Sequence, residues 1–247
     1  MARPRSAGYD DQREQILAQA AALFAQQGYT ATSMNQVAAA CSLSKAALYH
    51  YVRDKHALLA LVAEAHVKRL EAVVDEVRAE RLDPEARLRA LIVRFVREYS
   101  NAQNEHRVLT EDVKFLEDAE RETVVGIERR VVNAFAEAVA EVRPALKPAE
   151  LHKPLTMLLF GMINWMFTWL KPADEAAGPP QGESTPSGGG TAEGGPWGHQ
   201  VIGQRLTHEQ MAPMVAELFF GGLGAVSLPS APAPSPRKKT PRKETAL

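Results

Sequence analysis

Side chains with the reach to contact DNA are concentrated in one stretch of the chain, residues 30–55. Lys45, Tyr49 and His50 are long enough to meet base edges or phosphate groups from a helix that lies in a major groove. Ala46, beside them, is small, so such a helix could approach the bases closely. These residue types at this spacing predict a nucleic-acid interface.

Two short helices joined by a tight turn would have to position those side chains. Thr32 and Ser33 supply capping hydroxyls for a helix over 34–40, and Ser44 can cap a second helix over 45–52. This is the helix-turn-helix pattern, in which the second helix reads the DNA. An ordinary helical hairpin, with its tyrosines as packing residues, fits the same spacing.

The stretch resembles the DNA-binding domain of the TetR family of bacterial transcriptional regulators. The positions that carry the resemblance are Thr32, Ser33, Val37, Ala38, Leu43, Ser44, Leu48, Tyr49, Tyr51, Val52, Lys55, Leu58 and Leu59. Ser42 stands where the family usually has glycine, and a positive φ at that residue would cost about 1 kcal/mol. Lys55 begins the next helix, where its amine could hold a phosphate. The DNA-binding candidates are therefore Thr32, Ser33, Ser44, Lys45, Ala46, Tyr49, His50 and Lys55.

The composition of the chain excludes some classes of protein. The chain has 247 residues, 45% of them hydrophobic, a single cysteine and a net charge of −1. No run of roughly 18 apolar residues occurs, so we expect no membrane span, and the N-terminal residues have no signal-peptide core. Cys41 alone excludes a disulfide framework within the chain. These features predict a protein of the cytoplasm.

No residues form a pattern typical of catalysis. The seven histidines are scattered along the chain, and the cysteine lies in the predicted DNA-binding turn. Neither a nucleophile–base pair, nor metal-ligand spacing, nor a phosphate-binding loop is present. We therefore predict no enzyme activity, no catalytic residues, no metal site and no cofactor.

Hydrophobic periodicity predicts an all-α fold with about nine helices and two domains. Residues 1–55 form the DNA-binding domain, of which 1–9 is a flexible arm. Residues 56–227 form an effector-binding and dimerisation domain, interrupted by a flexible Gly/Pro-rich insertion at 173–205. Residues 228–247 form a disordered tail, rich in proline and then basic. Besides the two short helices, we expect helices at 10–27, 56–81, 85–101, 107–116, 118–142, 150–170 and 206–223.

The second domain could enclose an effector. The expected walls of a cavity are aromatic residues and methionines, although such residues more often form a plain core. Asn164 lies inside the most apolar helix, where an unpaired amide costs about 1–3 kcal/mol, so it needs a partner or a ligand. Arg107 and Lys114 could meet an anionic ligand. The effector-binding candidates are Phe95, Tyr99, Arg107, Lys114, Phe115, Met162, Asn164, Trp165, Met166 and Trp169.

The helices at 150–170 and 206–223 carry more apolar surface than one bundle needs. A symmetric four-helix interface between two copies would bury it. Such a homodimer would place two reading helices about 34 Å apart, matching a palindromic operator in double-stranded DNA. The dimer-interface candidates are Leu155, Leu159, Met211, Met214, Val215, Leu218 and Phe219.

A second resemblance concerns the effector. GMINWMFTWLKP, followed by LTHEQMAPMVAELFFGGL, resembles the last helices of TetR-family regulators that sense acyl-CoA thioesters, and HRVLTEDVKFL resembles the phenylacetyl-CoA-responsive group. The insertion at 173–205 departs from that pattern, in which a shorter loop joins the two helices. The resemblance implies a repressor of an aromatic or fatty acid catabolic operon, released by an acyl-CoA such as phenylacetyl-CoA. A TetR-type repressor of an efflux pump that senses hydrophobic drugs, or a helical protein-interaction adaptor, would fit the same pattern.

Overall fold

A computed structural model describes residues 7–166 and 208–226 of the chain. Within those ranges the chain forms nine α-helices and two short 3-10 helices, and no strand, which confirms the all-α prediction. The α-helices are α1 (Ala7–Gln27), α2 (Met34–Ala40), α3 (Lys45–Tyr49), α4 (Lys55–Ala79), α5 (Pro84–Asn101), α6 (Gln103–Asp112), α7 (Asp118–Val142), α8 (His152–Asn164) and α10 (His208–Ala225). The 3-10 helices are η1 (Val113–Phe115) and η2 (Pro144–Leu146).

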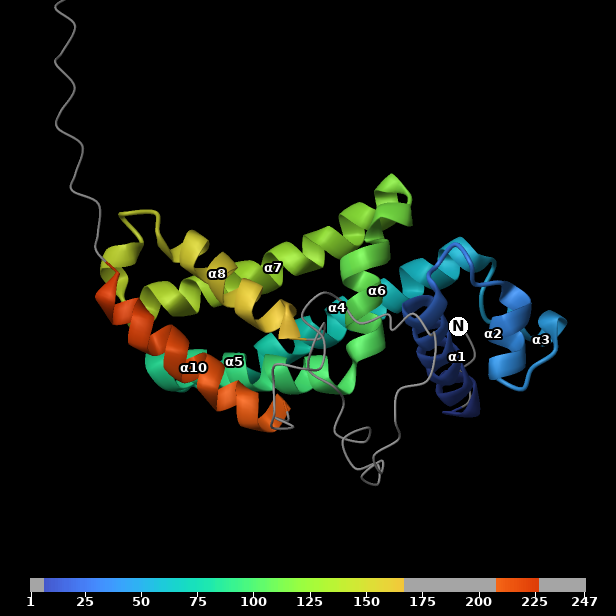
Figure 1. The fold of residues 1–247 in the computed structure, drawn as a ribbon, viewed down its shortest axis with the longest axis horizontal. Helices are drawn as coiled ribbons and strands as arrows, with labels where there is room; N and C mark the ends of the chain where they lie inside the picture. Colours follow the sequence, from blue (N-terminus) through green and yellow to red (C-terminus); the bar gives the residue numbers. More distant parts are fainter. Residues whose placement is uncertain (1–6, 167–207, 227–247) are drawn as a thin grey trace, which may run out of the picture.

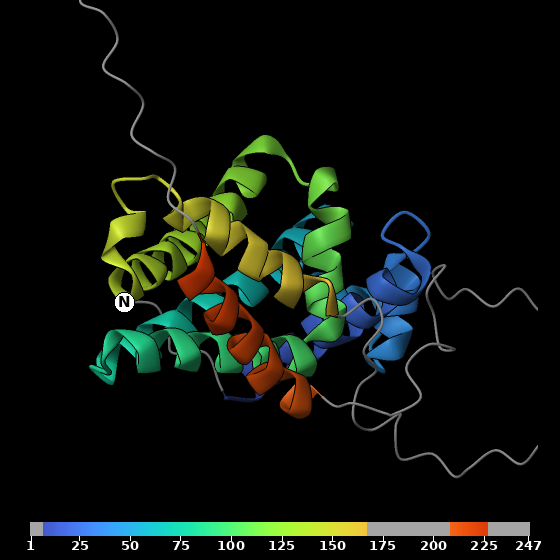
Figure 2. The ribbon, with the colours of Figure 1, turned by 60° about the vertical axis from the view of Figure 1, so that its left-hand side comes forward.

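The molecule is elongated, with the head, formed by α1–α3, at one end and the body, formed by α5, α7, α8 and α10, at the other (Figure 1). The long helix α4 runs from the head into the body, and α6 stands between α1 and the body helices (Figure 1). Turned by 60°, α8 and α10 lie beside one another on the outside of the body (Figure 2).

One hydrophobic cluster, called here the head cluster, holds the small helices together. Its buried residues come mainly from α1, α2 and α4, and Phe24 of α1 and Leu48 of α3 are almost fully enclosed. It extends past residue 55 into α4, α6 and α7, so the expected domain boundary does not separate two cores. The head cluster includes Ile16, Phe24, Tyr29, Val37, Leu48, Val52, Leu58, Leu59, Val62, Val67, Val108, Leu109, Leu116, Val124 and Ile127.

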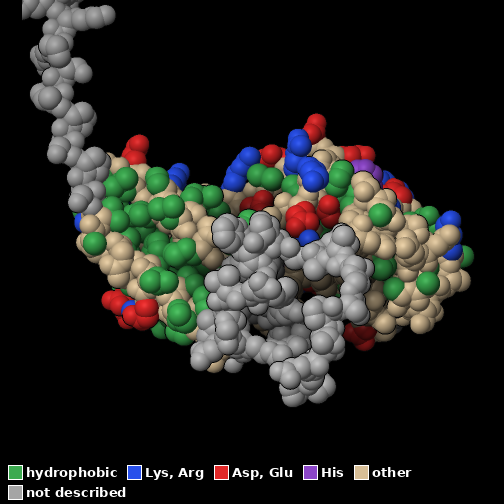
Figure 3. Space-filling model, in the orientation of Figure 1, with side chains coloured by type: hydrophobic (Ala, Val, Ile, Leu, Met, Phe, Trp, Pro, Cys, Tyr) green, Lys and Arg blue, Asp and Glu red, His purple; other side chains and the backbone are tan. Residues whose placement is uncertain are grey.

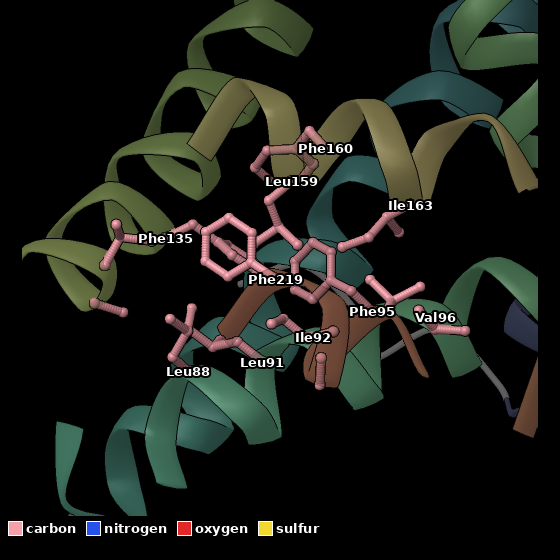
Figure 4. Close-up of a cluster of buried hydrophobic side chains, with 14 of the residues drawn as sticks. Leu88, Leu91, Ile92, Phe95, Val96, Phe135, Leu159, Phe160, Ile163 and Phe219 are labelled. Carbon is pink, nitrogen blue, oxygen red and sulfur yellow. The ribbon is translucent and has the colours of Figure 1, made fainter. Parts of the chain in front are cut away.

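A second cluster, the body cluster, fills the space between α4, α5, α7, α8 and α10 (Figure 4). Phe95 and Phe135 meet edge to face with ring centroids 4.7 Å apart, and Phe160 packs against both rings. The body cluster includes Leu70, Val74, Val77, Leu88, Leu91, Ile92, Phe95, Val96, Tyr99, Phe135, Leu159, Phe160, Ile163, Met166, Val215 and Phe219.

Several helix boundaries agree with the sequence and others do not. α2 and α7 have the predicted bounds, and Asp83 caps α5 ahead of Pro84 as the Asp-Pro pair indicates. The reading helix α3 ends at Tyr49 rather than at 52. α1 begins at Ala7, so the last three residues of the expected arm are helical. Residues 1–6, the insertion at 173–205 and the tail at 228–247 lie outside the described residues.

None of the helices within the described ranges combines the length and the apolar character that crossing a bilayer requires.

The turns rely on residues in the left-handed region. Gly28 ends α1 with φ +87°, a conformation in which glycine is favoured because it has no Cβ. Ser42, in the turn between α2 and α3, has φ +54°, which confirms that a non-glycine residue occupies the strained position of this turn. Arg81, before α5, has φ +50°.

Replacing Ser42 with glycine should raise the free energy of unfolding by about 1 kcal/mol, because a left-handed φ costs an L-residue that much more than glycine. Chemical denaturation measures the change. The control is Ala39→Gly, an exposed α2 residue, which should lower the same quantity by about 1 kcal/mol. A Ser42→Gly protein less stable than the unaltered protein contradicts this account of the turn.

Candidate DNA-binding surface and effector domain

Two serine caps fix the helix-turn-helix unit. Ser33 forms a capping box with Gln36: the Ser33 hydroxyl accepts from the Gln36 amide at 3.3 Å, and the Gln36 side chain accepts from the Ser33 amide at 2.8 Å. Ser44 caps α3 by accepting from the Ala47 amide at 3.1 Å. The role of Gln36 was missed in the sequence, although Ser followed three residues later by Gln is the signature of this motif.

The reading helix presents its predicted contact residues outward. Lys45, Ala46, Tyr49 and His50 are all exposed, with 43% of Tyr49 accessible to solvent. Leu48, on the opposite face, is fully buried in the head cluster and anchors the helix. The exposed set has the composition of a base-reading and phosphate-contacting surface.

Thr32 has a different position from the one expected of a DNA contact. Only 2% of it is exposed, and its hydroxyl donates to the Gly28 carbonyl oxygen at 2.9 Å and accepts from the Gln27 side chain at 3.1 Å. A hydroxyl so placed closes the turn between α1 and α2. The structure therefore corrects the assignment of Thr32 from DNA contact to a structural position within the head.

The ammonium group of Lys55 is also engaged within the chain. It donates to the carbonyl oxygens of Tyr29, Thr30 and Thr32 at 2.9, 3.2 and 2.9 Å. An ammonium has three hydrogens to donate, so all three are used. This geometry disagrees with the expectation that the amine holds a phosphate.

Part of the expected effector set lies together in the body. Phe95 and Tyr99 on α5 and Met166 after α8 belong to the body cluster, and Met162 packs against it. Phe95 is fully enclosed by neighbouring side chains, as Figure 4 shows. These four residues form a closed hydrophobic interior.

The other candidates do not share that interior. Phe115 lies in η1, where it packs against the head cluster rather than against the body, and Lys114 lies over its ring at 5.2 Å. Arg107 is exposed and pairs with Glu111 at 3.1 Å, one turn further along α6. The expectation that Phe115 lines a cavity with Phe95 is therefore wrong, because Phe115 packs against the head cluster. The expectation that Arg107 and Lys114 meet an anionic ligand stays a prediction.

The end of α8 is split between the interior and the surface. Trp165 is 66% exposed, so it faces outward rather than into a cavity. Asn164 is half-buried, and its side-chain oxygen is buried with no hydrogen-bond partner among the described residues. That orphaned acceptor agrees with the expectation that Asn164 requires a partner or a ligand. Trp169 lies outside the described residues.

Two grooves lie along α4 and α7, and the smaller of them is also lined by Arg87 and Leu91 of α5. They have volumes of about 40 and 230 Å³ and share Val74, Arg78, Ala134 and Glu137 as lining residues. Neither is lined by an expected effector residue. Within the part of the chain that the structure describes, no three His, Cys, Asp or Glu side chains are grouped as metal ligands.

A buried pair of histidines lies where α4, α5 and α6 meet. His66 and His106 are 0% and 2% exposed, and the Nε2 of His66 lies 3.4 Å from the Nδ1 of His106. The ring of His106 stacks on Tyr99 at 3.8 Å between centroids. Arg69 covers the pair, with a guanidinium nitrogen 3.5 Å from the Nδ1 of His66. No sequence signal pointed to this pair, since the two residues are forty positions apart.

Burial keeps both imidazoles neutral. It lowers the pKa of His66 to about 3, helped by the neighbouring His106 and Arg69, and lowers the pKa of His106 to about 4. Burial also raises the pKa of the stacked Tyr99 phenol. The carboxylates of Glu98 and Glu105 pair with Arg69 at 3.1 and 3.8 Å, and the charge of Glu128 contributes to the raised pKa of Tyr99.

Acidification should therefore destabilise the protein at pH values well above those at which exposed carboxyl groups titrate. Below pH 6.5 the unfolded chain binds protons at His66 and His106, whereas the folded chain does not until the pH approaches about 3 for His66 and about 4 for His106. Between pH 6.5 and 5 the free energy of unfolding should fall by up to about 1.4 kcal/mol per pH unit for each histidine.

Urea denaturation at several pH values measures this dependence. His106→Gln should remove close to half of it, whereas His50→Gln, which alters an exposed histidine, should leave the slope unchanged. A dependence in His106→Gln as steep as in the unaltered protein would show that the pair does not titrate as described.

An apolar surface remains uncovered on the body. The large exposed hydrophobic residues of α8 and α10, with Trp165 directly after α8, are 47–68% accessible. Figure 3 shows hydrophobic side chains gathered over this end of the molecule. The residues concerned are Met157, Leu158, Trp165, Met214 and Leu218.

The expected dimer residues divide between this surface and the core. Met214 and Leu218 are exposed, and Leu155 and Met211 are partly buried. Leu159, Val215 and Phe219 are buried in the body cluster, so their assignment to a dimer interface is corrected to core. The sequence predicts an effector contact at Trp165 and none for Met157 and Leu158, because a helix that is apolar all round does not indicate which face is covered.

The head has the capped two-helix arrangement of a helix-turn-helix DNA-binding domain. Residues 16–62 match the family model of bacterial regulatory proteins of the tetR family. Residues 81–175 match the model of tetracyclin repressor-like C-terminal domains. Together the two models match more than half of the chain, and the chain belongs to the TetR family of transcriptional regulators, with a DNA-binding and a ligand-binding domain.

Solved structures of the same fold are similar over most of the chain. A TetR-family transcriptional regulator from Bordetella parapertussis is 28% identical, with a TM-score of 0.70, covering 90% of this chain and 100% of that one. AibR, in complex with isovaleryl coenzyme A and operator DNA, is 23% identical with a TM-score of 0.62, covering 84% and 97%. The ketosteroid regulator KstR2 of Mycobacterium tuberculosis is 14% identical with a TM-score of 0.64, covering 85% and 94%. No curated protein matches the chain.

Proposed function

We propose that two copies of the chain form a repressor that binds a palindromic operator and is released by an acyl-CoA thioester, with phenylacetyl-CoA as the favoured effector. The regulated genes would be those of an aromatic or fatty acid catabolic operon. The observation that carries the DNA-binding part is the capped reading helix, which holds Lys45, Tyr49 and His50 outward on a buried anchor, Leu48.

The dimer is supported by the uncovered apolar surface of α8 and α10. Leu158 and Leu218 are 66% and 68% exposed, a large loss of hydrophobic free energy if they remain in water. Two copies related by a two-fold axis would bury this surface in a four-helix interface. The same axis would present two copies of α3 to successive major grooves of the operator.

The effector is supported by the composition of the interior and by resemblance. The rings of Phe95, Phe135 and Phe160 offer an apolar, aromatic environment that suits the acyl group of a thioester. AibR, a protein of similar fold, has been solved in complex with isovaleryl coenzyme A and operator DNA. An effector that relieves repression about 100-fold must favour the released state by about 2.7 kcal/mol.

A mobility-shift titration tests this function. The probe is the DNA upstream of the protein's own gene, with phenylacetyl-CoA, isovaleryl-CoA, a long-chain acyl-CoA, free phenylacetate and a cationic dye each added in turn. We expect a shift that phenylacetyl-CoA reverses and free phenylacetate does not. Tyr49→Ala should weaken binding about tenfold or more while the helical circular dichroism is unchanged.

The other outcomes separate the alternatives. Release by the cationic dye alone identifies a drug-responsive regulator of efflux. A shift that no thioester reverses retains the DNA-binding function and refutes the acyl-CoA effector. Equal loss of helicity and of binding in Tyr49→Ala would assign Tyr49 to the fold instead of to the operator.

Dimer formation has its own test, Leu218→Glu. This change would place a carboxylate from each copy in the proposed interface, where its desolvation costs several kcal/mol. We expect a dimer about 100-fold or more weaker by sedimentation equilibrium, with the monomer still folded. Asn133→Glu, an exposed position on α7, is the control and should leave the dimer intact. An unchanged dimer in Leu218→Glu refutes this interface.

A further inference from the structure

Besides α4, the segment formed by α6 and η1 also packs against the head. Tyr29, in the turn between α1 and α2, stacks on Phe115 of η1 with ring centroids 5.2 Å apart and planes inclined by 28°. Tyr29 is only 6% exposed, and Phe24 packs against its ring edge to face at 5.4 Å. The stack therefore connects the two family-model regions, since Tyr29 lies in the first and Phe115 in the second.

Lys55 fixes Tyr29 from the other side. Its ammonium lies 4.5 Å from the centre of the Tyr29 ring, and it donates to the carbonyl oxygens of Tyr29, Thr30 and Thr32 in the same turn. A cation held against an aromatic face and three carbonyl dipoles is well stabilised when it is partly withdrawn from water. The turn is thus held between the start of α4 and η1.

This turn determines where the reading unit begins. Thr32, whose carbonyl accepts from Lys55, directly precedes Ser33, the cap of α2. α2 is also bonded to the turn that leads into α3, because the Leu43 amide donates to the Ala38 carbonyl oxygen at 2.9 Å. A displacement of Tyr29 would therefore be passed to α2 and then to α3.

On the body side, Phe115 is attached to the helix that reaches the effector domain. η1 follows α6 directly, and α6 carries the buried His106, which stacks on Tyr99 of the body cluster. A single short helix therefore has one end against the body interior and the other end against the turn of the head.

We propose that Tyr29, Lys55 and Phe115 form a latch, and that Phe115 is a positioning residue for operator binding although it lies outside α1–α3, in η1. The latch holds the α1–α2 turn, and with it the reading helix, in the orientation that fits the operator. In this role Lys55 acts on the turn and not on a DNA phosphate. A shift of α6 would release the stack and allow the head to change its orientation.

The salt dependence of operator binding distinguishes positioning by Lys55 from phosphate contact. The probe is a duplex enriched from a random-sequence pool by the unaltered protein. Lys55→Met should weaken binding about tenfold or more and leave the slope of log Kd against log salt unchanged. A phosphate contact would instead lower that slope by about 0.9. Lys68→Met, the loss of one exposed charge on the same helix, is the control and should change neither quantity.

The contribution of Phe115 is tested with Phe115→Leu and Phe115→Met, which keep an apolar side chain and remove the ring. Each should weaken operator binding roughly threefold to tenfold, the range of an aromatic pair. Circular dichroism at the assay temperature establishes that the protein is folded, so a purely structural role would leave Kd unchanged. Phe220→Leu is the matched control, since Phe220, in the body, is also partly buried and lies under a cation, Arg89, at 4.4 Å.

A double-mutant cycle completes the test. Tyr29→Leu should weaken binding about as much as Phe115→Leu, and the double variant should bind no more weakly than the weaker of the two. Additive losses, a slope lowered by about 0.9 in Lys55→Met, or an unchanged Kd in both folded Phe115 variants would each overturn the latch.

Discussion

The structure depends on α4, a single helix that belongs to two hydrophobic cores. Leu58, Leu59 and Val62 are buried in the head cluster, and Leu70 and Val74 are buried in the body cluster. Close-packed interiors do not deform continuously, so neither end of this helix can move without repacking its core. The head is therefore mechanically tied to the body, as a regulator with an effector site distant from its DNA site requires.

His66 is a buried polar residue within the part of α4 that belongs to the head cluster, and Ala63 and Val67 beside it are buried and apolar. His66 lies between Val62 and Leu70 along the helix, enclosed by His106 and Tyr99 and covered by Arg69. A buried contact of neutral imidazoles is directional, so a small displacement of α6 weakens it more than it would weaken an apolar contact. Through α6 the same displacement reaches Phe115 and the turn that it holds.

The helices on the outer side of the body, α8 and α10, are apolar on more than one face. α8 and α10 place one apolar side, with Leu159 and Phe219, in the body cluster and leave another side, with Leu158 and Leu218, uncovered. Helices that are apolar on two sides require two partners. The body supplies one partner, and a second copy of the chain is the one we propose for the other.

Local sequence determined the parts of this protein that local interactions decide. The caps Ser33, Ser44 and Asp83 and the stop at Gly28 are where the sequence places them, because a cap bonds to amides within three residues of itself. The family could be inferred for the same reason, since its DNA-binding motif is one unbroken stretch. The exposed positions of α3 followed from helical periodicity alone.

Tertiary structure decided everything that depends on partners far apart in the chain. The sequence places Phe115 among aromatic residues that could line a pocket, but only the fold brings it onto Tyr29. The sequence predicts that Lys55 binds a phosphate, but in the folded chain its ammonium donates to three carbonyl groups. Likewise, periodicity places Leu159 and Leu218 on apolar faces of their helices. It does not indicate that Leu159 is covered and Leu218 is exposed. Whether a side chain is buried or hydrogen-bonded depends on the residues around it. When those residues are distant in the sequence, only the packing of the helices determines which of them become neighbours.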